Sequence, residues 1–204
     1  MIARIAVALV VAGLVAGVTA GPVTEQLRQS IDRVTAILAD PALAGAAMTA
    51  PRRAALRQVM DEAIDFPEAA RRALGIHWRA RTEAERAEFV VLFRDLVEYA
   101  YILRIEPYAG ETVVYVGEAV EHDQATVRTK LRPRRGEDLA VDYRLHRQGD
   151  RWLVYDVSIG GVSLVANYRT QFNTIIQTSS YAELLSRIRT RLRELEAPPR
   201  MAVR

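Results

Sequence analysis

The side chains best suited to acid–base or metal chemistry are few and scattered in this sequence. Its three histidines are His77, His122 and His146, and no two of them stand at metal-ligand spacing. The chain has no cysteine, which excludes disulfide bonds, thiolate zinc sites and cysteine catalysis. We therefore interpret the histidines as solvated surface residues, with His146 on the exposed face of a strand, and we expect no metal ion and no cofactor.

Asp156 is the carboxylate in the most unusual setting, because it interrupts the apolar strand 154–157. A buried carboxylic acid could act as a general base. We favour the other interpretation, in which Asp156 is an ion-pair or helix-capping partner. The pair Gly160-Gly161 ahead of a helix could bind phosphate through backbone N–H groups, and a plain strand-to-helix turn explains the pair equally well.

The tyrosines are more informative than the candidate acids. A tyrosine has an apolar body and one hydroxyl group that seeks a hydrogen-bond partner. Such residues suit a cavity that holds an apolar molecule with a polar end, and each of them can equally be an ordinary core residue. The eight tyrosines are Tyr99, Tyr101, Tyr108, Tyr115, Tyr143, Tyr155, Tyr168 and Tyr181.

The composition is that of an ordinary globular chain. Half of the 204 residues are hydrophobic and 26% are charged, which favours a single folded domain over a disordered chain. The 28 basic and 25 acidic residues give a formal net charge of +3. A nucleic-acid-binding protein concentrates a much larger excess of positive charge, so we exclude that class.

Residues 1–20 have the pattern of a secretory signal peptide. Arg4 precedes the uncharged apolar run 5–18, and small residues follow at a plausible cleavage site. The run is shorter than the roughly 20 residues of a membrane anchor, which is the alternative interpretation. An exported chain without disulfides fits a bacterial periplasm. We expect a soluble mature protein with one domain over residues 21–197 and a flexible tail over 198–204.

The expected elements are helices, then strands, then helices. Apolar residues three and four positions apart predict helices over about 22–39, 56–63, 67–74, 83–105, 164–175 and 181–197. The helix 83–105 is apolar on two faces and must therefore be covered on more than one side. Between them the period changes to two residues, which predicts four strands over about 113–120, 125–132, 139–146 and 152–159. Segregated helices beside an antiparallel sheet define an α+β fold.

Several longer segments resemble a known family. They are ARRALGIHW (70–78), FVVLFRDLVEYAY (89–101), YAGETVVYVGE (108–118), WLVYDVSIGGVSLVANYRTQF (152–172) and SSYAELLSRIR (179–189). Together they resemble the MlaC family, the periplasmic phospholipid-binding proteins of the toluene-tolerance and lipid-asymmetry transport system. The resemblance covers about residues 24–195. Gly160 departs from it, because a larger and often acidic residue is expected there.

The resemblance implies a soluble periplasmic carrier rather than an enzyme. Such a carrier moves diacyl phospholipid between an outer-membrane lipoprotein–porin complex and an inner-membrane ATP-driven transporter with a ring-shaped lipid-binding subunit. The implied fold is a curved four-stranded antiparallel sheet, like the cone of nuclear transport factors, wrapped by the N-terminal and C-terminal helices. We expect a monomer. A small periplasmic cone-fold enzyme, an isomerase or dehydratase that uses Asp156 and a pocket tyrosine, is the alternative.

A lipid carrier of this size needs a hollow apolar interior. Each buried methylene contributes about 0.8 kcal/mol to binding, so acyl chains must be shielded from water. Two acyl chains need a space of about 1,000 Å3, which is near the upper end of ordinary ligand pockets. The two-sided helix 83–105 and the apolar face of the sheet could line it. The expected lipid-contacting residues are Phe93, Val97, Tyr101, Val114, Val116, Val141, Tyr143, Leu145, Val154, Val165, Tyr168 and Phe172.

A basic patch is the expected docking surface for partners. The alternation in two adjacent strands places Arg128, Lys130, Arg132 and Arg144, together with His146, on one exposed face. A shuttle needs weak and fast contacts, and charge steers association without tight affinity. A solvated, arginine-rich surface without function is the alternative.

Overall fold

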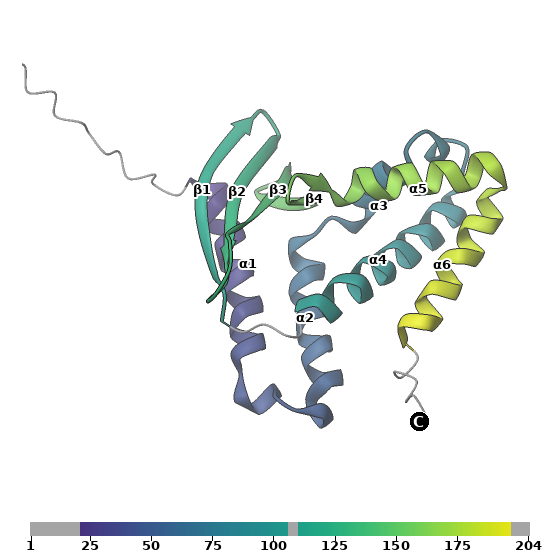
Figure 1. Ribbon diagram of the computed structural model, residues 1–204. Helices are drawn as coiled ribbons and strands as arrows, with labels where there is room; N and C mark the ends of the chain where they lie inside the picture. The colour runs from purple at the N-terminus through teal and green to yellow at the C-terminus, as the bar shows by residue number, and fades with distance from the viewer. Residues whose placement is uncertain (1–20, 106–109, 197–204) are drawn as a thin grey trace, which may run out of the picture.

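The computed structural model describes residues 21–105 and 110–196, with Ala46, residues 101–105 and Glu196 described as backbone only. The expected signal peptide and tail lie outside these residues. Figure 1 shows a sheet with helix α1 along it, α2 beside α1, and the remaining helices grouped on the other side of α2. The described helices are α1 (Pro22–Ala39), α2 (Thr49–Ala63), α3 (Phe66–Leu74), α4 (Glu83–Ile105), α5 (Leu164–Thr178) and α6 (Tyr181–Glu196).

The ends of the helices follow from the residues placed there. At the start of α4 the Thr82 hydroxyl accepts a hydrogen bond from the Glu85 N–H, and the Glu85 carboxylate accepts one from the Thr82 N–H at 2.8 Å. This is the predicted capping box. Helix α3 ends at Gly75, whose φ of 59° is readily adopted by a residue without a side chain.

The sheet has five antiparallel strands in sequential order, not the four that the sequence predicts. The strands are β1 (Thr112–Glu121), β2 (Gln124–Arg132), β3 (Leu139–Gln148), β4 (Arg151–Ile159) and β5 (Val162–Ser163). The fifth strand contains two residues, too few to show a period. The chain reverses into it at Gly160 and Gly161, with φ of 58° and 82°. This geometry agrees with the interpretation of Gly160-Gly161 as a plain turn.

Helix α1 covers one face of the sheet. Val23 and Leu27 pack there with buried residues of β2, β3 and β4. The N-cap residue of α1 is Gly21, which has no side-chain oxygen to cap the helix. Glu118 of β1 takes this role, because its carboxylate accepts a hydrogen bond from the Thr24 N–H at 2.6 Å. We call this face, with α1 on it, the α1 face. Its buried residues are Ala125, Val127, Leu145 and Val154.

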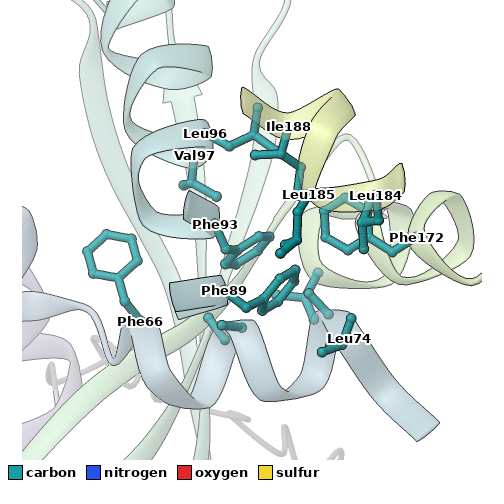
Figure 2. Packing of buried hydrophobic residues seen from close by; sticks show 14 of the residues in the cluster. Phe66, Leu74, Phe89, Phe93, Leu96, Val97, Phe172, Leu184, Leu185 and Ile188 are labelled. Carbon is teal, nitrogen blue, oxygen red and sulfur yellow. The ribbon is translucent and has the colours of Figure 1, made fainter. Parts of the chain in front are cut away.

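A second apolar cluster lies among the helices, as Figure 2 shows. Phe89 and Phe93 of α4 are both fully buried, and Phe172 of α5 meets Phe89 edge to face at 5.7 Å between ring centroids. Burying one such side chain contributes about 1.5–3 kcal/mol. Leu184 and Ile188 of α6 close the cluster. Helix α4 packs against α3 and α6, and its phenylalanine rings contact α5, so it is covered on more than one side, although Val91 is 57% exposed.

The opposite face of the sheet is partly covered as well, and here the prediction for His146 is wrong. Its side chain is 19% exposed and its Nε2 lies 2.9 Å from the carboxylate of Asp65, at the junction of α2 and α3. The Asp65 N–H also donates to the Val154 carbonyl, so this junction continues along the edge of β4. Strand alternation identifies the residues that share a face, but cannot show that a segment 81 residues away covers it.

Asp156 links the sheet to α5 by hydrogen bonds on this covered face. One carboxylate oxygen accepts hydrogen bonds from the Ser163 hydroxyl at 2.6 Å and from Arg144 at 3.3 Å. The other accepts the Val165 N–H at 3.0 Å. Ser163 in turn accepts the Ala166 N–H and caps α5. The predicted role of Asp156 as an ion-pair and capping partner is confirmed.

We expect Asp156→Ala to lower the free energy of unfolding by about 2–4 kcal/mol, because it leaves a buried backbone N–H and a helix start without their acceptor. Urea denaturation followed by circular dichroism measures this. Asp150→Ala, at an exposed hairpin turn, is the matched control and should change stability by less than about 0.5 kcal/mol. Equal stability of the two variants would contradict the assignment.

Candidate functional site

The residues expected to contact lipid fall into two apolar groups. Phe93, Val97, Val165 and Phe172 are buried in the helical cluster, and Tyr168 packs against it. Their rings are in direct contact: Phe93 and Tyr168 lie edge to face at 5.4 Å between centroids. The second group belongs to the α1 face of the sheet and contains Tyr143, Leu145 and Val154.

The two groups meet at one residue. Ile64, at the end of α2, packs against both the helical cluster and the cluster on the α1 face. It also forms an isolated bridge with Val154 at the edge of β4. The structure thus brings apolar walls from α4, α5 and the sheet to either side of a single junction.

The remaining expected residues take less enclosed positions. Val141 is half-buried on the same side of β3 as Tyr143. Val114 pairs with Lys130 in register and so lies on the opposite face. Val116 is 46% exposed at the β-bulge where β1 has one residue more than β2. The side chain of Tyr101 lies outside the described residues.

Two tyrosines give the α1 face a polar component. Burial raises the pKa of both Tyr115 and Tyr143 to about 12. The Arg28 guanidinium covers the Tyr115 ring at 4.2 Å and partly offsets the effect of burial on that hydroxyl. The Tyr115 hydroxyl is itself buried and has no hydrogen-bond partner within residues 21–105 and 110–196. The cluster on the α1 face therefore combines apolar side chains with one buried hydroxyl group that has no partner in the described residues.

A cavity of about 830 Å3 opens on the covered side of the sheet, the side of Asp156. Its size is near that expected for a lipid site, but its wall is not uniformly apolar. Of the residues expected to contact lipid, it includes Val165 alone. Its lining is Arg71, Arg72, Gly75, Ile76, Arg79, Arg144, Tyr155, Asp156, Ser163, Val165, Ala166 and Arg169. Sequence reasoning missed this arginine cluster. Its arginines come from separate elements of the chain, so no local spacing in the sequence links them.

The basic residues expected to form the docking surface do share one face. In the register of β2 and β3, Arg128 lies opposite Asp142 and Thr126 opposite Arg144. Two of the four are engaged within the protein: Arg132 with Asp138 at 3.0 Å, and Arg144 with Asp156. Arg128 and Lys130 are exposed.

The described part of the chain contains neither a metal-binding cluster nor a membrane-spanning helix. No group of three or more histidine, aspartate or glutamate side chains in residues 21–105 and 110–196 is placed to hold a metal ion. Over the same residues, every helix is too short or too polar to cross a bilayer.

Comparison with known proteins gives two concordant results. The sequence profile of the MlaC protein family matches residues 28–190. Among solved structures, the chain is similar to the phospholipid-binding protein from Ralstonia solanacearum, whose structure was determined in complex with a phospholipid. The TM-score is 0.76 and the sequence identity is 24%, over 85% of this chain and 98% of that one. At this identity the match establishes the shared fold.

We expect Tyr143→Phe to reduce the loss of stability between pH 10 and 12. The wild-type hydroxyl has a pKa raised above its unfolded value of about 10, so it stabilises the fold fully below pH 10 and loses this contribution as pH rises towards 12. The variant should lose about 1–2 kcal/mol less over this interval, as measured by urea denaturation at each pH. Parallel pH profiles for the variant and the wild type would show that Tyr143 titrates as a solvated phenol.

Proposed function

The chain belongs to the MlaC family, and from this premise we propose that it binds a diacyl phospholipid in an apolar cavity and carries it through the periplasm. The observation that carries the proposal is the family match over residues 28–190, joined to the shared fold of a relative that holds a phospholipid. We propose further that the open sheet is the curved wall of a cone like that of nuclear transport factors.

Apolar surfaces of the chain support this proposal. Two acyl chains with about 30 methylenes lose on the order of 20 kcal/mol on entering water, so a carrier must offer them a continuous apolar wall. The α1 face and the helical cluster supply such walls on both sides of Ile64.

The proposed setting is the periplasm. Residues 1–20 would direct export, and the mature protein would move lipid between an outer-membrane lipoprotein–porin complex and an inner-membrane transporter as a monomer. This traffic would maintain the lipid asymmetry of the outer membrane and contribute to toluene tolerance. Arg128 and Lys130, exposed on one strand, are the proposed contacts with these partners, and Arg132 and Arg144 contribute more weakly because each already has a carboxylate partner.

An enzyme that uses Asp156 as a base is the weaker alternative. The carboxylate is 4% exposed and both of its oxygens accept hydrogen bonds from within the protein. A general base must be free to accept a proton from substrate. The geometry around Asp156 is that of a structural carboxylate, which favours a binding protein.

We expect the protein purified from a bacterial periplasm to contain about one phospholipid per chain, with little headgroup selectivity, because acyl-chain burial dominates the affinity. Solvent extraction followed by mass spectrometry measures the content. Protein that is empty as purified, and that takes up no lipid from vesicles, would exclude the carrier function.

We expect Val141→Asp to lower phospholipid content by about tenfold or more, because a carboxylate on the α1 face has no partner to compensate its burial. Ala140→Asp is the matched control, since Ala140 is the neighbouring residue of β3 and is exposed on the other face. The control should retain lipid, and both variants should keep their helical circular dichroism. Unfolding of Val141→Asp would identify Val141 as a core residue and move the lipid wall elsewhere.

A further inference from the structure

The cavity beside Asp156 gathers an unusual amount of positive charge. Five of its twelve lining residues are arginines and one is an aspartate. The arginines come from α3, from the residue after the 3-10 turn Gly75–Trp78, from β3 and from α5, so they converge from four parts of the chain. Guanidinium groups of like charge repel one another, and the repulsion is relieved when an anion binds among them.

Three of these arginines are already paired. Arg71 and Arg72 share the carboxylate of Glu68, at 2.6 Å and 2.7 Å, and together they hold the pKa of Glu68 at about 2. Arg72 also lies over the ring of Tyr155 at 3.8 Å. Arg144 is paired with Asp156. These contacts fix the positions of the three guanidinium groups, and they involve only two carboxylates, those of Glu68 and Asp156.

Two arginines are left without an acidic partner. Within the described residues, neither Arg79 nor Arg169 makes an ion pair or a side-chain hydrogen bond. The five arginines of the cavity are balanced by the carboxylates of Glu68 and Asp156 alone, which leaves a local charge of +3. Gly75 gives Arg169 room beside the turn. A Cβ atom there would lie 3.2 Å from Cδ of Arg169, so the missing side chain leaves room for Arg169 to cross the turn.

We propose that this cavity is an oxyanion site that binds a phosphate group through Arg79 and Arg169. A guanidinium presents several N–H donors in a planar fork that matches phosphate oxygens. The same cavity carries apolar surface from Ile76, Val165 and Ala166, which suits a phosphate attached to a larger body. The proposal rests on the proposed carrier function, in which the phosphate group belongs to the carried lipid. Free inorganic phosphate is the other source of the same oxyanion.

The first experiment titrates the full chain, stripped of lipid by detergent exchange, with inorganic phosphate and with sn-glycero-3-phosphoglycerol at low salt, followed by isothermal titration calorimetry. The double variant Arg79→Gln/Arg169→Gln should bind both probes about tenfold or more weakly, because two charge-assisted contacts are lost. The control Arg135→Gln/Arg191→Gln removes the same charge at exposed positions outside the cavity and should bind within about twofold of the wild type.

A second experiment separates the two sources of phosphate. The wild type is loaded from vesicles of phosphatidylglycerol and phosphatidylcholine and titrated again with inorganic phosphate. If the site holds the lipid headgroup, loading abolishes phosphate binding; if it holds free phosphate, loading leaves phosphate binding unchanged. Either outcome supports an oxyanion site.

The proposal is overturned if the wild type binds neither probe, or if the cavity variant and the control variant weaken binding equally. A wild type that loads phospholipid but binds no phosphate removes the oxyanion site and leaves the carrier function intact. A wild type that binds phosphate but takes up no phospholipid removes the carrier function and leaves the oxyanion site intact. The two proposals can therefore fail separately.

Discussion

The carboxylate of Asp156 is the contact on which the arrangement of this molecule depends. It is a buried charge, and such a charge is tolerated only when hydrogen bonds and an opposite charge compensate its lost hydration. Here the compensation comes from β3, from β5 and from the first residues of α5. Satisfying one carboxylate therefore fixes where α5 leaves the sheet, and with it the positions of Tyr168 and Phe172 in the helical cluster. The same carboxylate forms part of the wall of the arginine-lined cavity.

The apolar interior is divided rather than continuous. One cluster holds α1 against the sheet, and the other joins α3, α4, α5 and α6. The segment Ile64–Asp65 links them, with Ile64 packed against both clusters and Asp65 bonded to the edge of β4 and to His146. The sheet and the helical cluster are also joined by Asp156, whose carboxylate accepts hydrogen bonds from Ser163 and from the start of α5, so polar contacts as well as Ile64 hold the two clusters together.

Local patterns identified most of the elements, and long-range pairing explains what they missed. The helix starts at Thr82 and Ser163 were predictable because capping depends on residues within one turn. The two-residue strand β5 carries no period and escaped prediction. The partner of His146 is 81 residues away, and no local pattern encodes that distance. The arginine cluster was hidden for a different reason: with 27 arginines in the chain, the few that converge cannot be separated from the many that are solvated.

The shape of the sheet edges has a consequence for how the protein behaves at high concentration. An exposed strand edge is a template for β-aggregation, because its unpaired N–H and C=O groups can accept a strand from a neighbouring molecule. In the described residues the β4 edge is occupied twice, near Val154 by the α2–α3 junction and near Ser158 by β5. The β1 edge is interrupted by the bulge at Val116, which breaks the regular ladder that an incoming strand would need. The geometry of the backbone thus protects this sheet from assembling into cross-β fibres.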